Sequence, residues 1–237
     1  ILLQRATTLF EVFRENIMPV NPIFFGKHTK EHNMIKLLED NSPYYSKIYF
    51  NEIIEIQKIL RNIDMNSLVN AIPNFSVVRH PKLSLDVSRM IINSLPFKDD
   101  FNWKTTIIFL TNPGKQSIVH KDGPGKFTLN ISFDIKDDKC ITKWYTDKLI
   151  EENNLGDQSI HTKHPKGNLY QIIKTSDDLE SSKEMIMGSD EALLFNTSIW
   201  HRFDNRKSAN QRGIVCIRTD DDTTYEQAKD KIFKYIG

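Results

Sequence analysis

The sequence SIVHKDGPGKFTLNISFDI, residues 117–135, contains the pattern that decides the fold. From Phe127 to Ile135, apolar side chains alternate with small or polar ones, and this period of two is typical of a β-strand. A second β-rich run ends near His120, and a Gly-Pro-Gly turn separates the two runs. The stretch therefore predicts two short strands joined by a turn.

Short β-rich runs separated by turn residues recur through the C-terminal half of the chain. We expect strands at residues 105–110, 127–135, 141–146, 169–174, 192–195, 199–203 and 213–219. Several short strands in succession, without helices between them, predict a sandwich or a jelly roll. Residues 151–167 are polar and have no clear period, so we expect an irregular segment near the opening of the barrel.

The first hundred residues show helical periodicity instead. Apolar residues recur at helical spacing in residues 2–17, 50–63 and 83–95, and residues 225–236 predict a closing helix. We therefore expect an α+β fold in a single domain, 1–237. Its expected parts are a mainly helical region at 1–100 packed on one sheet, a jelly-roll core at 101–220 and a C-terminal helix at 221–237.

Composition and charge exclude several classes of function. The chain has 237 residues, of which 39% are hydrophobic and 27% charged, as is ordinary for a globular protein with a core. The formal net charge is +1 and no basic stripe stands out, so there is no strong nucleic-acid signal. Apolar runs are too short to span a membrane. The two cysteines form no Cys-x-x-Cys pair, which favours a reducing, cytoplasmic location.

Two histidines and an aspartate form a candidate metal site. His120 and Asp122 are two residues apart at the end of a β-run, so their side chains point to the same side. His201, in the run at 199–203, is the best third ligand. Two histidines and one carboxylate are the ligand set of a non-haem Fe(II) site with open positions. A histidine bonded to a surface turn is the alternative explanation of His-x-Asp, and the distal histidine on a β-run favours the metal.

Two arginines share one face of the last expected strand with Ile214 and Cys216. Arg212 and Arg218 therefore point the same way. An arginine on an otherwise apolar strand needs an anionic partner, and its planar guanidinium suits a carboxylate. A salt bridge to a carboxylate of the protein remains the alternative for either arginine.

The strand at 127–135 has one apolar and one polar face. We expect the apolar face to lie outward against the N-terminal helices. The polar face, which includes Thr128 and Asn130, would then line a ligand pocket. The pattern also allows the reverse arrangement, a plain core with a solvated outer face.

The pattern His120-Lys121-Asp122, the distal His201 and Arg212 resembles that of the 2-oxoglutarate- and Fe(II)-dependent oxygenases. The run Asp190–Asn196, ending in Trp200-His201-Arg202-Phe203, resembles the approach to the distal histidine in this family. The resemblance covers roughly residues 103–219 and implies a double-stranded β-helix, the cupin-like jelly roll. Other branches of the family place the arginine further on, where Arg218 stands.

The resemblance also implies an activity. His120, Asp122 and His201 would be the catalytic metal ligands, and Arg212 or Arg218 would bind the cosubstrate together with Thr128 and Asn130. The cofactors implied are Fe(II), 2-oxoglutarate and O2, and the reaction is hydroxylation of a small molecule or a protein side chain, with release of succinate and CO2. Two other hypotheses remain: a cupin-type metal- or sugar-binding protein without 2-oxoglutarate chemistry, and a non-catalytic interaction domain.

Overall fold

The computed structural model describes residues 35–63, 78–79, 83–122, 127–155, 160–163, 169–173, 179–219 and 222–237. They belong to a unit that spans Asn33–Gly237. The helix expected at residues 2–17 and the Gly-Pro-Gly turn at 123–125 lie outside the described residues.

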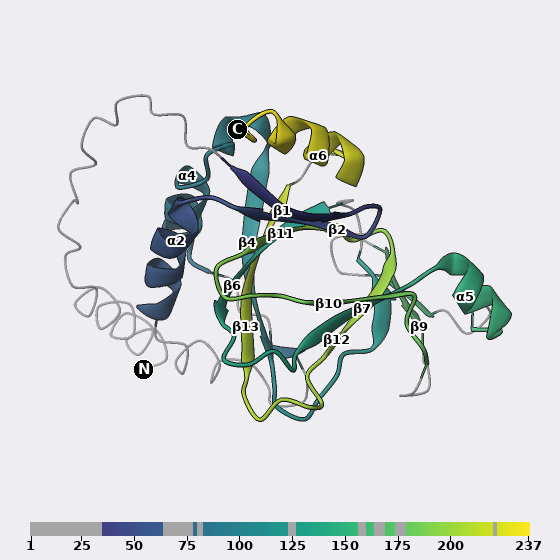
Figure 1. Cartoon of the computed structure of the whole chain (residues 1–237). Helices are drawn as coiled ribbons and strands as arrows, with labels where there is room; N and C mark the ends of the chain where they lie inside the picture. Colours follow the sequence, from purple (N-terminus) through teal and green to yellow (C-terminus); the bar gives the residue numbers. More distant parts are fainter. Residues whose placement is uncertain are drawn as a thin grey trace, which may run out of the picture. The chain divides into compact units, whose positions relative to one another are not determined.

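Two antiparallel sheets make up the β-rich part of the described chain (Figure 1). The larger sheet contains β1 (Lys36–Asn41), β2 (Tyr45–Tyr49), β3 (Val78–Arg79), β4 (Trp103–Thr111), β6 (Phe127–Asp134), β11 (Ala192–Asn196) and β13 (Arg212–Thr219). The smaller sheet contains β5 (Val119–Lys121), β7 (Ile141–Tyr145), β8 (Ile160–Lys163), β9 (Leu169–Ile173), β10 (Lys183–Ile186) and β12 (Trp200–Asp204).

The strand order in both sheets joins segments that are far apart in the sequence. The larger sheet has the order β1-β2-β11-β6-β13-β4-β3, and the smaller has the order β10-β7-β12-β5-β9-β8. Two antiparallel sheets with few helices form the double-stranded β-helix, or jelly roll, that the sequence predicts. The strands expected between residues 105 and 219 are all present, with small shifts at their ends.

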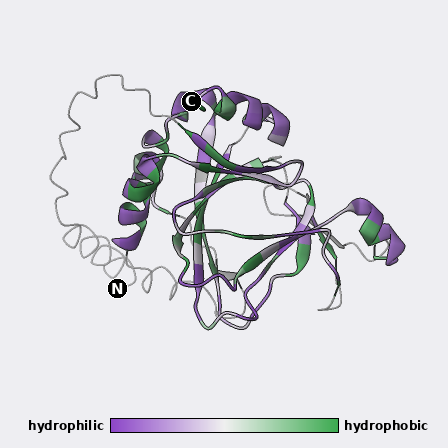
Figure 2. Cartoon of the chain, viewed as in Figure 1, coloured by the Kyte–Doolittle hydropathy of each residue, from purple (hydrophilic) through white to green (hydrophobic). Residues whose placement is uncertain are grey.

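Three helices contact the larger sheet: α2 (Glu52–Arg61), α4 (Leu85–Asn93) and α6 (Tyr225–Phe233). Their apolar side chains pack against the outward side chains of the sheet. Hydrophilic residues make up much of the rest of these helices (Figure 2). Ile53 of α2 belongs to the same buried cluster as Leu129 and Ile131 of β6. The expected outward orientation of the apolar face of β6 is therefore confirmed.

Local sequence explains where two of these helices begin. Ser84 precedes α4, and its hydroxyl accepts a hydrogen bond from the backbone N–H of Val87. Thr224 precedes α6 and forms a reciprocal capping box with Gln227. A short 3-10 helix, η1 (Lys98–Asp100), leads into β4.

The N-terminal part is less helical than the sequence suggests. Residues 36–49 form the hairpin β1–β2, whose turn contains a cis peptide bond between Ser42 and Pro43. The polar pair Ser46-Lys47 obscures the period of two in β2. The strand forms because β2 pairs with β11, nearly 150 residues later along the chain, and this contact leaves no local signal.

The segment expected to be irregular at residues 151–167 contains regular structure. It includes the end of helix α5 (Asp147–Glu152) and the strand β8. Ile150 of α5 packs with Val119, Tyr145 and Trp200 on the outer face of the smaller sheet. The expectation was wrong for these residues, and 156–159 and 164–167 lie outside the described residues.

The layer between the two sheets is largely aromatic. Tyr45 stacks on Trp144 with ring centroids 5.1 Å apart, and Trp144 lies 5.2 Å from Phe195. Phe203 and Ile214 belong to the same buried cluster. Because these side chains fill the interior, polar groups inside the barrel are confined to a few positions.

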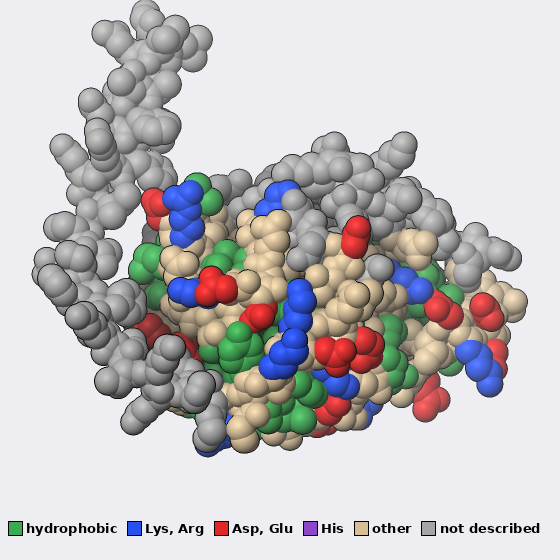
Figure 3. Space-filling model, turned by 90° about the horizontal axis from the view of Figure 1, so that it is seen from above, with side chains coloured by type: hydrophobic (Ala, Val, Ile, Leu, Met, Phe, Trp, Pro, Cys, Tyr) green, Lys and Arg blue, Asp and Glu red, His purple; other side chains and the backbone are tan. Residues whose placement is uncertain are grey.

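Acidic and basic side chains lie interspersed on the face shown in Figure 3, with hydrophobic side chains among them. Neither sign dominates this face among the described residues. None of the helices in the described ranges is long and apolar enough to cross a membrane.

Asp40 connects the unexpected hairpin to the C-terminal helix. Its Oδ2 lies 2.8 Å from Lys229 Nζ in α6, and its Oδ1 accepts hydrogen bonds from the hydroxyls of Ser42 and Ser46. Burial alone would raise the pKa of Asp40, but these hydrogen bonds hold it below the usual value of 3.8. The charged form is thus favoured in the folded state, and its stabilising effect is lost as the pH falls through the folded pKa.

We predict that Asp40→Asn lowers the free energy of unfolding at pH 7 by about 0.5–1.5 kcal/mol, because it removes a charge-assisted contact that is partly exposed. The difference from the wild type should begin to shrink near pH 4, where Asp40 becomes protonated in the unfolded chain, and should disappear as the pH falls through the lowered pKa of the folded state. Urea unfolding at pH 7 and pH 3 measures this. Asp86→Asn, at an exposed ion pair of 4.0 Å, is the matched control and should change little at either pH. An equal loss for Asp40→Asn at both pH values would contradict the prediction.

Candidate metal centre

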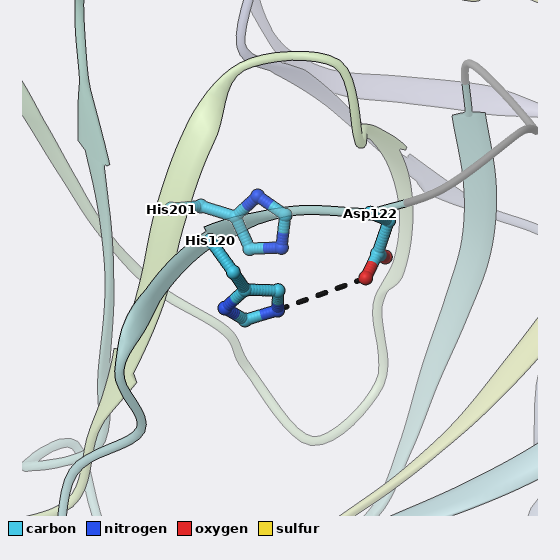
Figure 4. Close-up of side chains that lie close together, drawn as sticks. All are labelled: His120, Asp122 and His201. Atoms are coloured by element: carbon cyan, nitrogen blue, oxygen red, sulfur yellow. Dashed lines mark ion pairs between the residues drawn. The ribbon is translucent and has the colours of Figure 1, made fainter. Parts of the chain in front are cut away.

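The structure brings the three predicted ligands together (Figure 4). His120 lies on β5, Asp122 directly follows that strand, and His201 lies on the neighbouring β12. The backbone register places His201 directly opposite His120, and their ring centroids are 4.4 Å apart. One ligand atom from each of the three residues lies within 4.8 Å of the others. This separation fits one ion bound by all three.

Hydrogen bonds orient both imidazole rings. His120 Nδ1 lies 2.9 Å from the carbonyl oxygen of Ile118, and His201 Nδ1 lies 2.8 Å from that of Ile199. Because a carbonyl only accepts, each Nδ1 must carry the proton, and Nε2 is then free to bind a metal. Burial, together with the adjacent His120, lowers the pKa of His201 to about 3. His201 is therefore a neutral ligand, as metal coordination requires.

Asp122 is held so that one of its oxygens faces the histidines. Its Oδ1 lies 3.7 Å from His120 Nε2, as Figure 4 shows. Its Oδ2 accepts a hydrogen bond of 3.0 Å from Arg218 Nη2, and its backbone N–H donates to the carbonyl of Thr197. Arg218 thus positions the carboxylate, as partners of metal ligands commonly do.

A small cavity of about 20 Å³ adjoins the three ligands. Such a volume has room for one or two water molecules. Thr128, Asn130 and Arg218 supply its other polar groups, and the apolar part of its lining consists of Phe109, Phe195, Phe203, Ile214 and Cys216. Thr128 donates to Asn130 Oδ1, and the side chain of Asn130 is buried at the wall of the cavity.

The two predicted arginines lie at opposite ends of β13 and in different surroundings. Arg218 lines the cavity and pairs with Asp122, so the alternative of a salt bridge to the protein holds for it. Arg212 is 3% exposed and is not in the cavity lining. Its guanidinium donates to Thr142 Oγ1 at 3.1 Å and to Cys140 Sγ at 3.4 Å, and its Nε has no partner. No carboxylate of the described chain forms an ion pair with Arg212.

Sequence reasoning missed the aromatic lining of the site. Phe203 is two residues after His201 on β12, and the alternation of a strand would have placed it on the same face. Phe109 faces the cavity because β4 pairs with β13, where Phe109 is opposite Ile214. Only the strand register reveals that Phe109 belongs to the cavity lining.

The donor set itself limits the metal. Two imidazole nitrogens and one carboxylate oxygen on one side of an ion fit non-haem Fe(II) and related divalent ions. The cavity next to the ligands leaves space for further ligands that the protein does not supply. The residues present therefore fit a catalytic metal better than a closed structural one.

Comparison with known proteins finds similar folds but no close relative. The chain matches no protein-family model, and no curated protein matches it in sequence. The non-haem alpha-ketoglutarate-dependent carbocyclase SnoK from nogalamycin biosynthesis has a TM-score of 0.50 and 10% identity, over 82% of this chain and 85% of SnoK. HygX from Streptomyces hygroscopicus, solved with nickel and 2-oxoglutarate, has a TM-score of 0.45 and 10% identity, over 73% of this chain and 81% of HygX.

A cupin 2 domain-containing protein from Halorhodospira halophila is also similar, with a TM-score of 0.29 and 9% identity over 63% of this chain and 69% of that protein. The structural neighbours are thus cupin-fold proteins, and 2-oxoglutarate-dependent enzymes are among them. At such low identity, the similarity demonstrates the fold alone.

We predict that His201→Ala and Asp122→Ala abolish stoichiometric binding of Co(II), because each removes one of three protein ligands. Arg218→Met should weaken binding by about 10- to 100-fold, since it only releases the carboxylate from its position. Calorimetric titration of the metal measures both effects. Arg89→Met, at an exposed ion pair on α4, is the control and should bind like the wild type. Wild-type affinity in Asp122→Ala would show that the cluster is not a metal site.

Proposed function

We propose that this protein is an Fe(II)- and 2-oxoglutarate-dependent oxygenase that hydroxylates a small molecule or a protein side chain and releases succinate and CO2. The observation that carries the proposal is the pair formed by the His120, Asp122 and His201 cluster and the buried Arg212. The first can hold a metal with open positions, and the second is a buried cation that forms no ion pair among the described residues. Both lie inside the same barrel.

The charge on Arg212 supports an anionic ligand. Burying a charge without a counter-charge is strongly unfavourable. The neighbouring groups, Thr142 and Cys140, do not supply one, because burial raises the pKa of the Cys140 thiol although Arg212 acts to lower it. Cys140 is therefore uncharged at neutral pH. A carboxylate bound through two parallel hydrogen bonds would compensate the guanidinium.

Each group of residues has its own role in the proposed reaction. When bound, Fe(II) with 2-oxoglutarate and O2 supplies the oxidising chemistry. His120, Asp122 and His201 hold the ion, and Arg218 keeps Asp122 in place. Thr128 and Asn130 offer hydrogen bonds to the cosubstrate, and Arg212 binds its distal carboxylate. The aromatic side chains around the cavity exclude water.

We also place this activity in the reducing cytoplasm. Cys140 and Cys216 are both free and buried. Free thiols of this kind, like a ferrous ion, are maintained best in a reducing compartment.

A cupin-type metal-binding protein is the second candidate. The size of the cavity favours it, because about 20 Å³ does not accommodate a five-carbon dicarboxylate without movement of a side chain. Such a protein would bind the metal but would not respond to 2-oxoglutarate. A non-catalytic interaction domain would bind neither.

Conversion of 2-oxoglutarate to succinate tests the proposal directly. We expect the protein with Fe(II), ascorbate and O2 to form succinate slowly even without its own substrate, and His201→Ala to form none. Chromatographic measurement of succinate, with and without a chelator, gives the result. Metal binding without any iron-dependent succinate, and without binding of 2-oxoglutarate, would favour the cupin alternative.

We predict that Arg212→Met weakens 2-oxoglutarate binding by about 10- to 100-fold, the loss expected for a charge-assisted pair. Affinity for Co(II) should change little, because Arg212 lies outside the cavity lining. Arg212→Lys keeps the charge and should recover part of the affinity. Calorimetry on the Co(II)-loaded proteins measures both constants. Unchanged 2-oxoglutarate affinity in both the Arg212 and the Arg218 variants would exclude an arginine anchor.

A further inference from the structure

We propose that Phe203 is a specificity-determining residue, whose ring must leave its place beside Arg212 before a dicarboxylate can reach from the metal to that arginine. The inference rests on the proposed function. According to this proposal, the site selects those 2-oxo acids that carry a second carboxylate. A 2-oxo monocarboxylate would lack the group that displaces the ring.

The ring of Phe203 lies between the two halves of the proposed site. It contributes to the cavity beside the metal ligands, and its centroid lies 4.8 Å from the guanidinium carbon of Arg212. Arg212 itself is not in contact with that cavity. A ligand that touches both the metal and Arg212 therefore has to occupy space that Phe203 now fills.

The backbone of Phe203 cannot supply the movement. Its N–H donates to the hydroxyl of Ser117 at 2.9 Å, and its carbonyl accepts a hydrogen bond from the N–H of Ser117 at 2.8 Å. On its other side, the strand pairs Phe203 with Thr142 of β7. With both edges of β12 bonded, the side chain has to turn about its own torsions.

The exchange at Arg212 explains the selectivity. A cation facing an aromatic ring is partly compensated, and a carboxylate with two charge-assisted hydrogen bonds compensates it better. An incoming carboxylate therefore displaces the ring from the guanidinium. In the open form of the protein, the ring is turned away from Arg212. The apparent affinity for 2-oxoglutarate is the intrinsic affinity multiplied by the fraction of the free protein that is in this open form.

Removing the ring should consequently improve binding. We expect Phe203→Leu and Phe203→Ala to bind 2-oxoglutarate about tenfold more tightly than the wild type, since the open form no longer has to be selected. Their affinity for 2-oxobutyrate, a monocarboxylate of the same class, should change little, because this acid has no second carboxylate to reach Arg212 and displace the ring. Calorimetry on Zn(II)-loaded protein measures these affinities. Phe233→Leu, in α6, is the matched control outside the barrel, and denaturant unfolding checks that each variant is folded.

A second readout follows the ring itself. 4-Fluorophenylalanine at position 203 should give a ¹⁹F resonance that shifts when 2-oxoglutarate binds to the Zn(II) protein and stays in place with 2-oxobutyrate. The same label at position 233 should not respond to either acid. The shift and the tighter binding together support the proposal.

Three results would overturn it in distinguishable ways. Equal 2-oxoglutarate affinity in the wild type and Phe203→Leu, with no ¹⁹F shift, removes the role of Phe203 and leaves the oxygenase intact. Weaker 2-oxoglutarate binding in Phe203→Leu would mean that the ring contacts the bound ligand and does not have to move away. Binding of Zn(II) with no 2-oxoglutarate binding by any variant refutes the proposed function, and this inference with it.

Discussion

The pairing of β5 with β12 is the constraint on which the candidate site depends. Only His201 and His120 are paired directly within these strands, and this contact determines the distance between the two imidazoles. Further bonds hold the same register, including the bridge between Gln116 and Asp204 and the two bonds between Ser117 and Phe203. A slip by one residue would turn His201 to the outer face, because side chains alternate along a strand.

The outer surfaces of both sheets are covered so that this short pairing persists. On the larger sheet, α2, α4 and α6 bury the apolar face that β6 and β13 present. On the smaller sheet, α5 covers Val119 and Trp200, the neighbours of the two histidines. Asp147 at the start of α5 accepts hydrogen bonds from Lys121 and from the indole of Trp200. The strands that carry the ligands are thus packed from outside and hydrogen-bonded within the sheet.

Arg212, which is buried, and Arg218, which is partly exposed, lie on one strand and differ in how their charge is compensated. Arg218 is compensated by Asp122, and the resulting pair orients a candidate metal ligand. Within the described part of the chain, Arg212 contacts the neutral groups of Thr142 and Cys140 and the ring of Phe203. In a low-dielectric interior such a difference is large, because an unpaired charge is far more unfavourable than a paired one. The strand therefore has one arginine paired with a carboxylate of the protein and one for which we propose an anionic ligand.

Local patterns in the sequence were sufficient for much of the fold, and the pattern of residue types pointed to the three members of the cluster of His120, Asp122 and His201. The period of two marked β6 and β13, helical spacing marked α2 and α4, and the His-x-Asp pair with a later histidine marked the cluster. The strand and helix periods and the His-x-Asp pair depend on residues within a few positions of one another, so a single sequence reveals them. His201 is far from Asp122 in the sequence and was selected as a histidine on a predicted strand.

Tertiary structure alone decided the remaining features, because they depend on which strands pair and in what register. The hairpin β1–β2 exists through its pairing with β11, and its own residues show no clear alternation. The sequence placed Arg212 and Arg218 on one face but did not distinguish them; Asp122, brought from a distant strand, pairs with only one. Phe203 is part of the site because β12 and β13 face each other across the barrel. Long-range register is a property of the folded chain, and no local period encodes it.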